Sequence, residues 1–130
     1  MLPARITLTI TEGSLKGEEY VFHDAARCVV GRSSDCDVTL PTDLLHRDIS
    51  RHHCEFEIDP PTVRVRDLDS LNGTYVNGEK IGPRPNLLAR GGSEQDRGVR
   101  ELRNGDEVRV GGTVIRVSVD VLRLLPMTWG

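Results

Sequence analysis

The sequence has few aromatic residues, few lysines and no long apolar run, and these shortages exclude several classes of protein. Aromatic residues make up 4% of its 130 residues, and only two residues are lysine. No apolar stretch approaches the roughly 20 residues that a membrane-spanning helix needs. The formal net charge is −3, whereas a dedicated nucleic-acid-binding domain is usually basic. We therefore expect neither a nucleic acid nor a membrane as a partner.

Cysteines are also scarce, and their spacing does not suit a metal site. The three cysteines are Cys28, Cys36 and Cys54. The N-terminal stretch MLPARITLTITEG lacks the apolar core of a signal peptide, which predicts a cytoplasmic protein with reduced thiols. A zinc site would have to draw on a scattered set: Cys36, His46, His52 or His53, and Cys54. Zinc ligands usually come in close pairs, but His46 follows Cys36 by ten residues. We therefore expect no metal and no other cofactor.

The residues that are abundant favour strands over helices. Val, Ile and Thr together number 29, whereas Ala and Met together number 6. Short segments with alternating apolar residues recur between turn residues, and Asn77-Gly78 is a strong hairpin signal. The predicted strands are 5–11, 18–22, 27–30, 37–40, 53–58, 62–66, 74–76, 107–110 and 113–119. The pattern predicts an all-β sandwich of two antiparallel sheets with about 10–11 short strands.

The segments outside these strands divide the chain into a domain, two long loops and a tail. We expect one domain over residues 1–120, with loops at 41–49 and at 82–103. The loop 82–103 is rich in Gly, Pro and charge, which is typical of a mobile insertion or of a partner contact. Residues 121–130 form an apolar tail, VLRLLPMTWG. This tail either packs on the sandwich, contacts a partner or a second domain, or marks where a longer chain was cut.

Three predicted loops carry residue types that suit an anion. They are Gly31-Arg32-Ser33-Ser34, Ser50-Arg51-His52-His53 and Ser70-Leu71-Asn72-Gly73-Thr74. Loops of a sandwich gather at its two ends, so all three can meet at one end. Guanidinium groups, hydroxyls and backbone amides are the donors that a phosphate dianion needs. The net negative charge does not oppose such a site, because a local arginine cluster acts at short range.

These pieces, in this order and spacing, resemble a forkhead-associated (FHA) domain over roughly residues 5–120. The matching residues are Gly31-Arg32, Ser50 with His53, the segment 67–74, Asn77-Gly78 and Asn104-Gly105-Asp106. The resemblance implies an eleven-stranded β-sandwich that binds phosphothreonine peptides through loops at one end. It implies that Arg32, Ser50 and Arg51 hold the phosphate, and that Asn72 bonds the peptide backbone. Ser33, Leu71 and Arg47 are further candidate contacts, and Gly31, His53 and Gly73 take structural positions. Leu71 stands where the family often has threonine, which bears on selectivity between phosphothreonine and phosphoserine.

Parts of two enzyme motifs occur in the sequence, but neither motif is complete. The run His46-Arg47-Asp48 matches the H-R-D of a kinase catalytic loop, but the asparagine expected five residues after that aspartate is absent. Ser50, His53 and Asp48 lie within one short stretch, which does not favour a hydrolase triad, and no nucleophile elbow is present. We therefore expect a binding module and no enzyme.

The main prediction is a phosphothreonine-peptide-binding signalling module of a Ser/Thr-kinase pathway, of a bacterial type. The alternative is a phospho-independent interaction or autoregulatory domain of a larger regulator or kinase, which Leu71 and the loop 82–103 keep open. A metal-binding domain is a third and minor reading. Dependence of binding on phosphate separates the first two.

Overall fold

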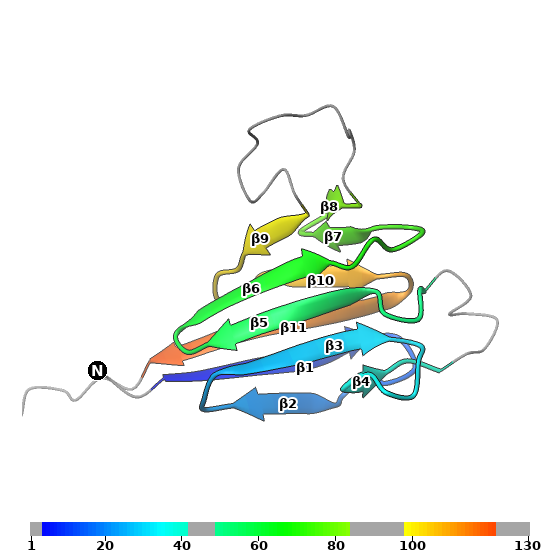
Figure 1. Cartoon of the computed structure of the whole chain (residues 1–130). Helices are drawn as coiled ribbons and strands as arrows, with labels where there is room; N and C mark the ends of the chain where they lie inside the picture. The colour runs from blue at the N-terminus through cyan, green and yellow to red at the C-terminus, as the bar shows by residue number, and fades with distance from the viewer. Residues whose placement is uncertain (1–3, 42–48, 84–97, 122–130) are drawn as a thin grey trace, which may run out of the picture.

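The protein is a sandwich of two sheets, which Figure 1 shows as a computed structural model describing residues 4–41, 49–83 and 98–121. The first sheet contains Ala4–Glu12 (β1), Glu19–Phe22 (β2), Thr74–Val76 (β7), Glu79–Gly82 (β8), Glu107–Val110 (β10) and Thr113–Val121 (β11). Its strand order is β2-β1-β11-β10-β7-β8. The second sheet contains Ala26–Gly31 (β3), Val38–Thr39 (β4), Cys54–Asp59 (β5), Thr62–Asp67 (β6) and Val99–Glu101 (β9). Its order is β4-β3-β5-β6-β9, and the all-β sandwich predicted from the sequence is confirmed.

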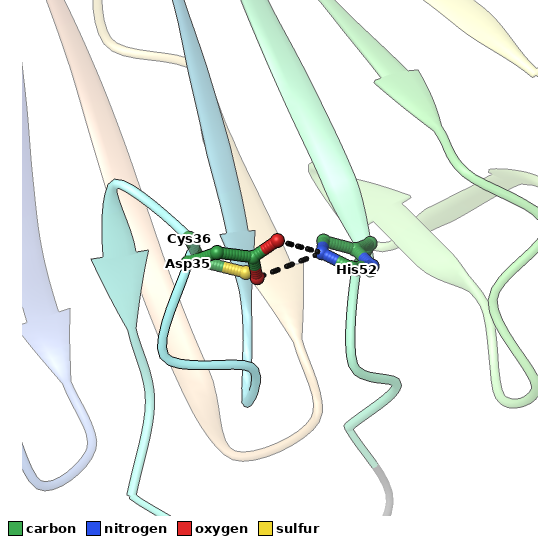
Figure 2. A group of neighbouring side chains, drawn as sticks. All are labelled: Asp35, Cys36 and His52. Atoms are coloured by element: carbon green, nitrogen blue, oxygen red, sulfur yellow. Dashed lines mark hydrogen bonds and ion pairs between the residues drawn. The ribbon is translucent and has the colours of Figure 1, made fainter.

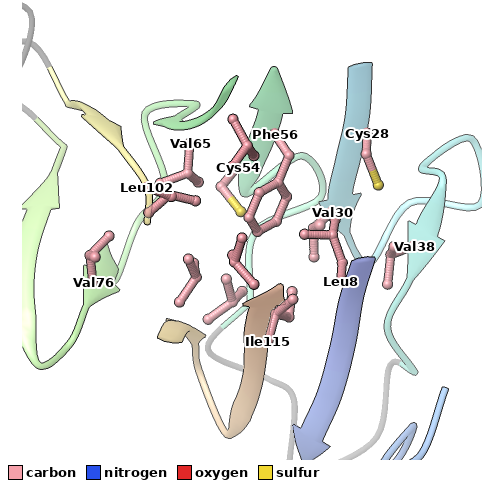
Figure 3. Packing of buried hydrophobic residues seen from close by; sticks show 14 of the residues in the cluster. Leu8, Cys28, Val30, Val38, Cys54, Phe56, Val65, Val76, Leu102 and Ile115 are labelled. Atoms are coloured by element: carbon pink, nitrogen blue, oxygen red, sulfur yellow. The ribbon is translucent and has the colours of Figure 1, made fainter. Parts of the chain in front are cut away.

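One apolar core lies between the two sheets. Ile6, Leu8 and Ile10 alternate along β1 and are buried, as the period-two pattern predicts. Phe56 of β5 is the largest fully buried side chain, and Figure 3 shows it in the same cluster as Leu8. Burying each such side chain stabilises the fold by about 1.5–3 kcal/mol. The core therefore holds the strand ends rigidly enough to position loops.

Besides β8, which completes the predicted Asn77-Gly78 hairpin but is not among the predicted strands, the structure differs from the sequence prediction in two places. The prediction of wholly antiparallel sheets is wrong at one edge, because β3 and β4 pair in parallel. The segment 82–103 is also not loop throughout, since β9 pairs with β6 and buries Val99. Three residues are too few to display an alternating pattern, so glycine and charge around them hid this strand. The remaining loop residues 84–97, the loop residues 42–48 and the tail from residue 122 onward lie outside the described residues.

Asn77 does more than form the predicted hairpin turn. It takes a left-handed conformation, with φ of 50°, at the turn between β7 and β8. Its side-chain nitrogen donates to Asp106 at 3.0 Å, and its side-chain oxygen accepts from the Glu107 amide at 2.9 Å. Asn77 therefore joins the β7–β8 hairpin to the start of β10.

In the part of the chain that the structure describes, no helix is long and apolar enough to cross a membrane.

Candidate functional site

The strand register brings the three predicted loops to one end of the second sheet. Val30 near the end of β3 pairs with Cys54 at the start of β5, and Cys54 pairs with Asp67 at the end of β6. The segments that follow β3, precede β5 and follow β6 therefore leave the sheet side by side. We call residues 31–37, 49–53 and 67–74 together the three-loop face.

Backbone contacts join the first two segments of the three-loop face. The amide of Arg32 donates to the carbonyl of Ser50 at 3.2 Å, and the amide of Ser33 donates to the carbonyl of Arg51 at 3.1 Å. Gly31 allows this approach, because a Cβ added there would lie 2.0 Å from the Arg51 carbonyl oxygen. A side chain at residue 31 would therefore force the segment before β5 away.

His53 joins the second segment to the third. Its side chain is fully buried, and its Nδ1 accepts from the Ser50 amide at 3.1 Å. Its Nε2 lies 2.7 Å from the Gly73 carbonyl oxygen. Because an amide can only donate, Nδ1 carries no proton, and Nε2 carries the proton that goes to Gly73. Gly73 itself has a φ of 98°, which favours glycine.

A buried carboxylate organises the third segment. Asp67 accepts from the Ser70 amide at 3.0 Å and from the hydroxyls of Ser70 and Thr74 at 2.5 and 2.6 Å. The Ser70 hydroxyl oxygen in turn accepts from the Gly73 amide at 3.0 Å. Such a satisfied network fixes the turn that presents Asn72. The sequence does not predict roles for Asp67, Ser70 and Thr74, although all three lie in the motif segment 67–74.

Backbone groups of neighbouring segments hold the side chains of Arg32 and Ser50 by hydrogen bonds. The Nε of Arg32 donates to the Ile49 carbonyl at 2.5 Å. The hydroxyl oxygen of Ser50 accepts from the Leu71 amide at 2.9 Å, so its own proton is not used in that bond. A hydroxyl held in this way can donate to an anion at the surface. Arg32 is therefore anchored to the second segment of the face, and Ser50 is anchored to the third.

The other predicted contact residues differ in their setting. Arg51 and Asn72 are exposed, and Leu71 is 84% exposed. The hydroxyl of Ser33 bonds the Asp35 carboxylate, and this bond, followed by one from His52, lowers the pKa of Asp35. Ser33 is thus engaged by a neighbouring acid. Arg47 lies outside the described residues.

All three cysteines are free and buried. Burial raises the pKa of the Cys28 thiol to about 12 and that of Cys54 well above its ordinary value. The thiols of these two residues are therefore protonated and unreactive at neutral pH.

The arrangement suits the binding of an anion. The segments that carry Arg32, Ser50 and Arg51 lie side by side at one end of the second sheet, and charge-assisted bonds from such residue types are strong and directional. Within the described part of the face, Ser50 accepts from Leu71 and His53 bonds two backbone groups. These two residues therefore do not form a nucleophile–base pair.

Comparison with known proteins identifies related sequences. The profile of the FHA domain family matches residues 28–111. The glycogen accumulation regulator GarA of Mycobacterium tuberculosis is 34% identical over 109 residues, which are 84% of this chain and 54% of that protein. The oxoglutarate dehydrogenase inhibitor of Corynebacterium glutamicum is 31% identical over 111 residues, which are 85% of this chain and 63% of that protein. The chain thus spans little more than half the length of these relatives.

Solved structures match over nearly the whole fold. An FHA domain studied for its phosphothreonine-dependent interactions is 27% identical, with a TM-score of 0.65, and the match covers 88% of this chain and 95% of that one. The FHA domain of FhaA, solved in complex with the intracellular domain of Rv3910, is 28% identical with a TM-score of 0.64. That match covers 86% of this chain and 98% of the other.

Proposed function

The chain belongs to the FHA domain family, and from this premise we propose that it binds phosphothreonine peptides at the three-loop face. Its partners are proteins phosphorylated by a Ser/Thr kinase, and its role is that of a cytoplasmic signalling module without enzymatic activity. The relatives named as a regulator and an inhibitor support such a role.

One observation carries the assignment of the phosphate contacts. The Arg32 guanidinium is fixed to the carbonyl of Ile49, and Ile49 directly precedes Ser50. A cation and a hydroxyl proton are therefore offered from adjacent points, which suits a tetrahedral dianion. In this proposal Arg51 supplies a second cation, and Asn72 bonds the peptide backbone. We expect an affinity on the order of micromolar, about −8 kcal/mol.

Selectivity for phosphothreonine over phosphoserine is part of the proposal. The two differ by one methyl group, and burying a methyl contributes about 1 kcal/mol, which is roughly tenfold in affinity. Leu71 is the exposed apolar side chain beside Ser50. It can supply apolar contact in place of the threonine that the family often has there.

The experiment begins with a degenerate peptide library in matched phosphothreonine, phosphoserine and unmodified forms. The best phosphothreonine peptide is then titrated by calorimetry into the wild type and two arginine variants. Losing one charged hydrogen bond costs about 1.5–3 kcal/mol, so Arg32→Ala should lose at least about tenfold in affinity. Arg27→Ala is the matched control, because Arg27 is exposed near the opposite end of β3.

The outcomes separate the proposal from its alternative. Binding that requires both the phosphate and Arg32, and is unchanged in Arg27→Ala, supports the proposed site. Equal binding of phosphorylated and unmodified peptides would instead indicate a phospho-independent interaction domain. Unchanged binding by a folded Arg32→Ala variant would refute the assignment of the phosphate contacts.

A further inference from the structure

We propose that Asp35, Cys36 and His52 form a binding site for a divalent transition-metal ion of the zinc type. Figure 2 shows the three side chains converging from the loop between β3 and β4 and from the segment before β5. Each residue offers one possible ligand atom, and these three atoms lie within 4.8 Å of one another. No established property of the chain assigns a metal here, and the inference does not depend on phosphopeptide binding.

The donor set suits zinc better than other common ions. Zinc is borderline soft and takes thiolate, imidazole and carboxylate ligands in a tetrahedral arrangement, whereas calcium and magnesium prefer oxygen alone. A doubly charged ion also balances one thiolate and one carboxylate, so the bound site carries no net charge beyond that of its neighbours. Three protein ligands would leave a fourth position for water.

The distances are close to those of a formed site. Ligand atoms 2.0–2.3 Å from a tetrahedral ion are separated by roughly 3.3–3.6 Å. The Nε2 of His52 already lies 2.9 and 3.1 Å from the two Asp35 carboxylate oxygens. The side chains of His52 and Asp35 are 47% and 68% exposed. Both can therefore rotate and move their ligand atoms by the distance of about an ångström that a formed site requires. Their exposure also gives an ion a path from solvent.

Cys36 is the fixed member of the group. It is 7% exposed, its amide donates to the Ser33 carbonyl at 3.0 Å, and its thiol donates to the Arg51 carbonyl at 3.1 Å. Metal binding replaces the S–H bond with a sulfur–metal bond and releases the proton to solvent. Burial raises the pKa of this thiol, so metal affinity should fall as the pH is lowered.

The three residues also form a satisfied group without an ion. The Asp35–His52 pair and the bond from Cys36 to Arg51 together use the same atoms. A metal would replace the exposed Asp35–His52 pair and the part-buried Cys36–Arg51 bond by a cross-link between two segments of the three-loop face. The test must therefore distinguish an ion site from an ion pair.

The test uses the full chain, reduced and stripped of metal, titrated with cobalt(II) as a spectroscopic substitute for zinc. We expect saturable binding of one ion per chain with a sulfur-to-cobalt charge-transfer band, which zinc displaces. Cys36→Ser should abolish the band, and Asp35→Asn and His52→Ala should each weaken binding at least about tenfold. His23→Ala is the matched control, since His23 is exposed in the turn before β3, and it should bind as the wild type does.

A second readout covers variants that fold poorly. Zinc should raise the thermal unfolding midpoint of the wild type and of His23→Ala, because a ligand that binds only the folded state stabilises it. It should not raise the midpoint of His52→Ala, whose side chain lies at the surface. Absence of both the band and the thermal shift in the wild type would overturn the proposal. Binding that persists unchanged in His52→Ala and Cys36→Ser would overturn it as well.

Discussion

Replacing His53 with alanine should loosen the three-loop face without removing any proposed peptide contact. The change deletes the acceptor for the Ser50 amide and the donor to the Gly73 carbonyl. Each buried polar group left without a partner costs about 1–3 kcal/mol, so we expect about 4 kcal/mol in total. A domain of this size has a free energy of unfolding of about 5–15 kcal/mol, so the variant stays folded. With a urea slope of about 2 kcal/mol per molar, its unfolding midpoint should fall by about 2 M.

Two conservative variants divide this effect. In His53→Asn the side-chain oxygen takes the place of Nδ1 and can accept from Ser50, whereas in His53→Gln the amide nitrogen can reach Gly73. Each should recover part of the stability that alanine loses. Peptide affinity, corrected for the folded fraction, should fall most in the alanine variant. An alanine variant within about 0.5 kcal/mol of the wild type in urea unfolding would refute the reasoning.

Two further predictions follow from packing and from ionisation. Gly31→Ala should unfold the domain or displace Arg51, because the new Cβ meets a backbone carbonyl. Gly17→Ala is the matched comparison, because its Cβ meets no atom within 4 Å, although Gly17 has a φ of 99°. In circular-dichroism melts Gly17→Ala should lower the free energy of unfolding only by the ~1–2 kcal/mol of backbone strain. Raising the pH should weaken the fold, because the unfolded Cys28 thiol ionises near its ordinary value of 9.0 and the folded one only near about 12. The Cys28 contribution to the free energy of unfolding should fall by about 1.4 kcal/mol per pH unit between these values. Cys28→Ala should therefore reduce the slope measured in urea titrations, and an unchanged slope would contradict the assignment.

The sequence predicts most strands of this fold because its patterns are local. The alternation of Ile6, Leu8 and Ile10 is visible along one strand, and glycines close the hairpin of β10 and β11. It does not predict β9, which has three residues and gains its place only by pairing with β6. It also does not predict that β4 runs parallel to β3, because strand direction depends on the path of the intervening loop.

The candidate site shows the same division between local and non-local information. The resemblance assigns Arg32, Ser50 and Asn72 from their motifs, and the structure places all three on the three-loop face. It cannot assign the network around Asp67, since hydrogen-bond geometry appears only after the turn is folded. The sequence offers Cys36 and His52 only as members of a scattered zinc set, and it does not point to Asp35, because two separate segments bring the three residues together.

The most direct test of the central claim is a nuclear magnetic resonance titration with the selected peptide in phosphothreonine and unmodified forms. We predict that the phosphorylated peptide shifts the backbone amide resonances of Arg32, Ser50 and Asn72, while that of Ala26 at the other end of β3 stays unchanged. The unmodified peptide should leave the resonances of all four amides unchanged. Shifts confined to the sheet faces, or equal shifts with both peptides, would contradict the claim that the three-loop face reads phosphothreonine.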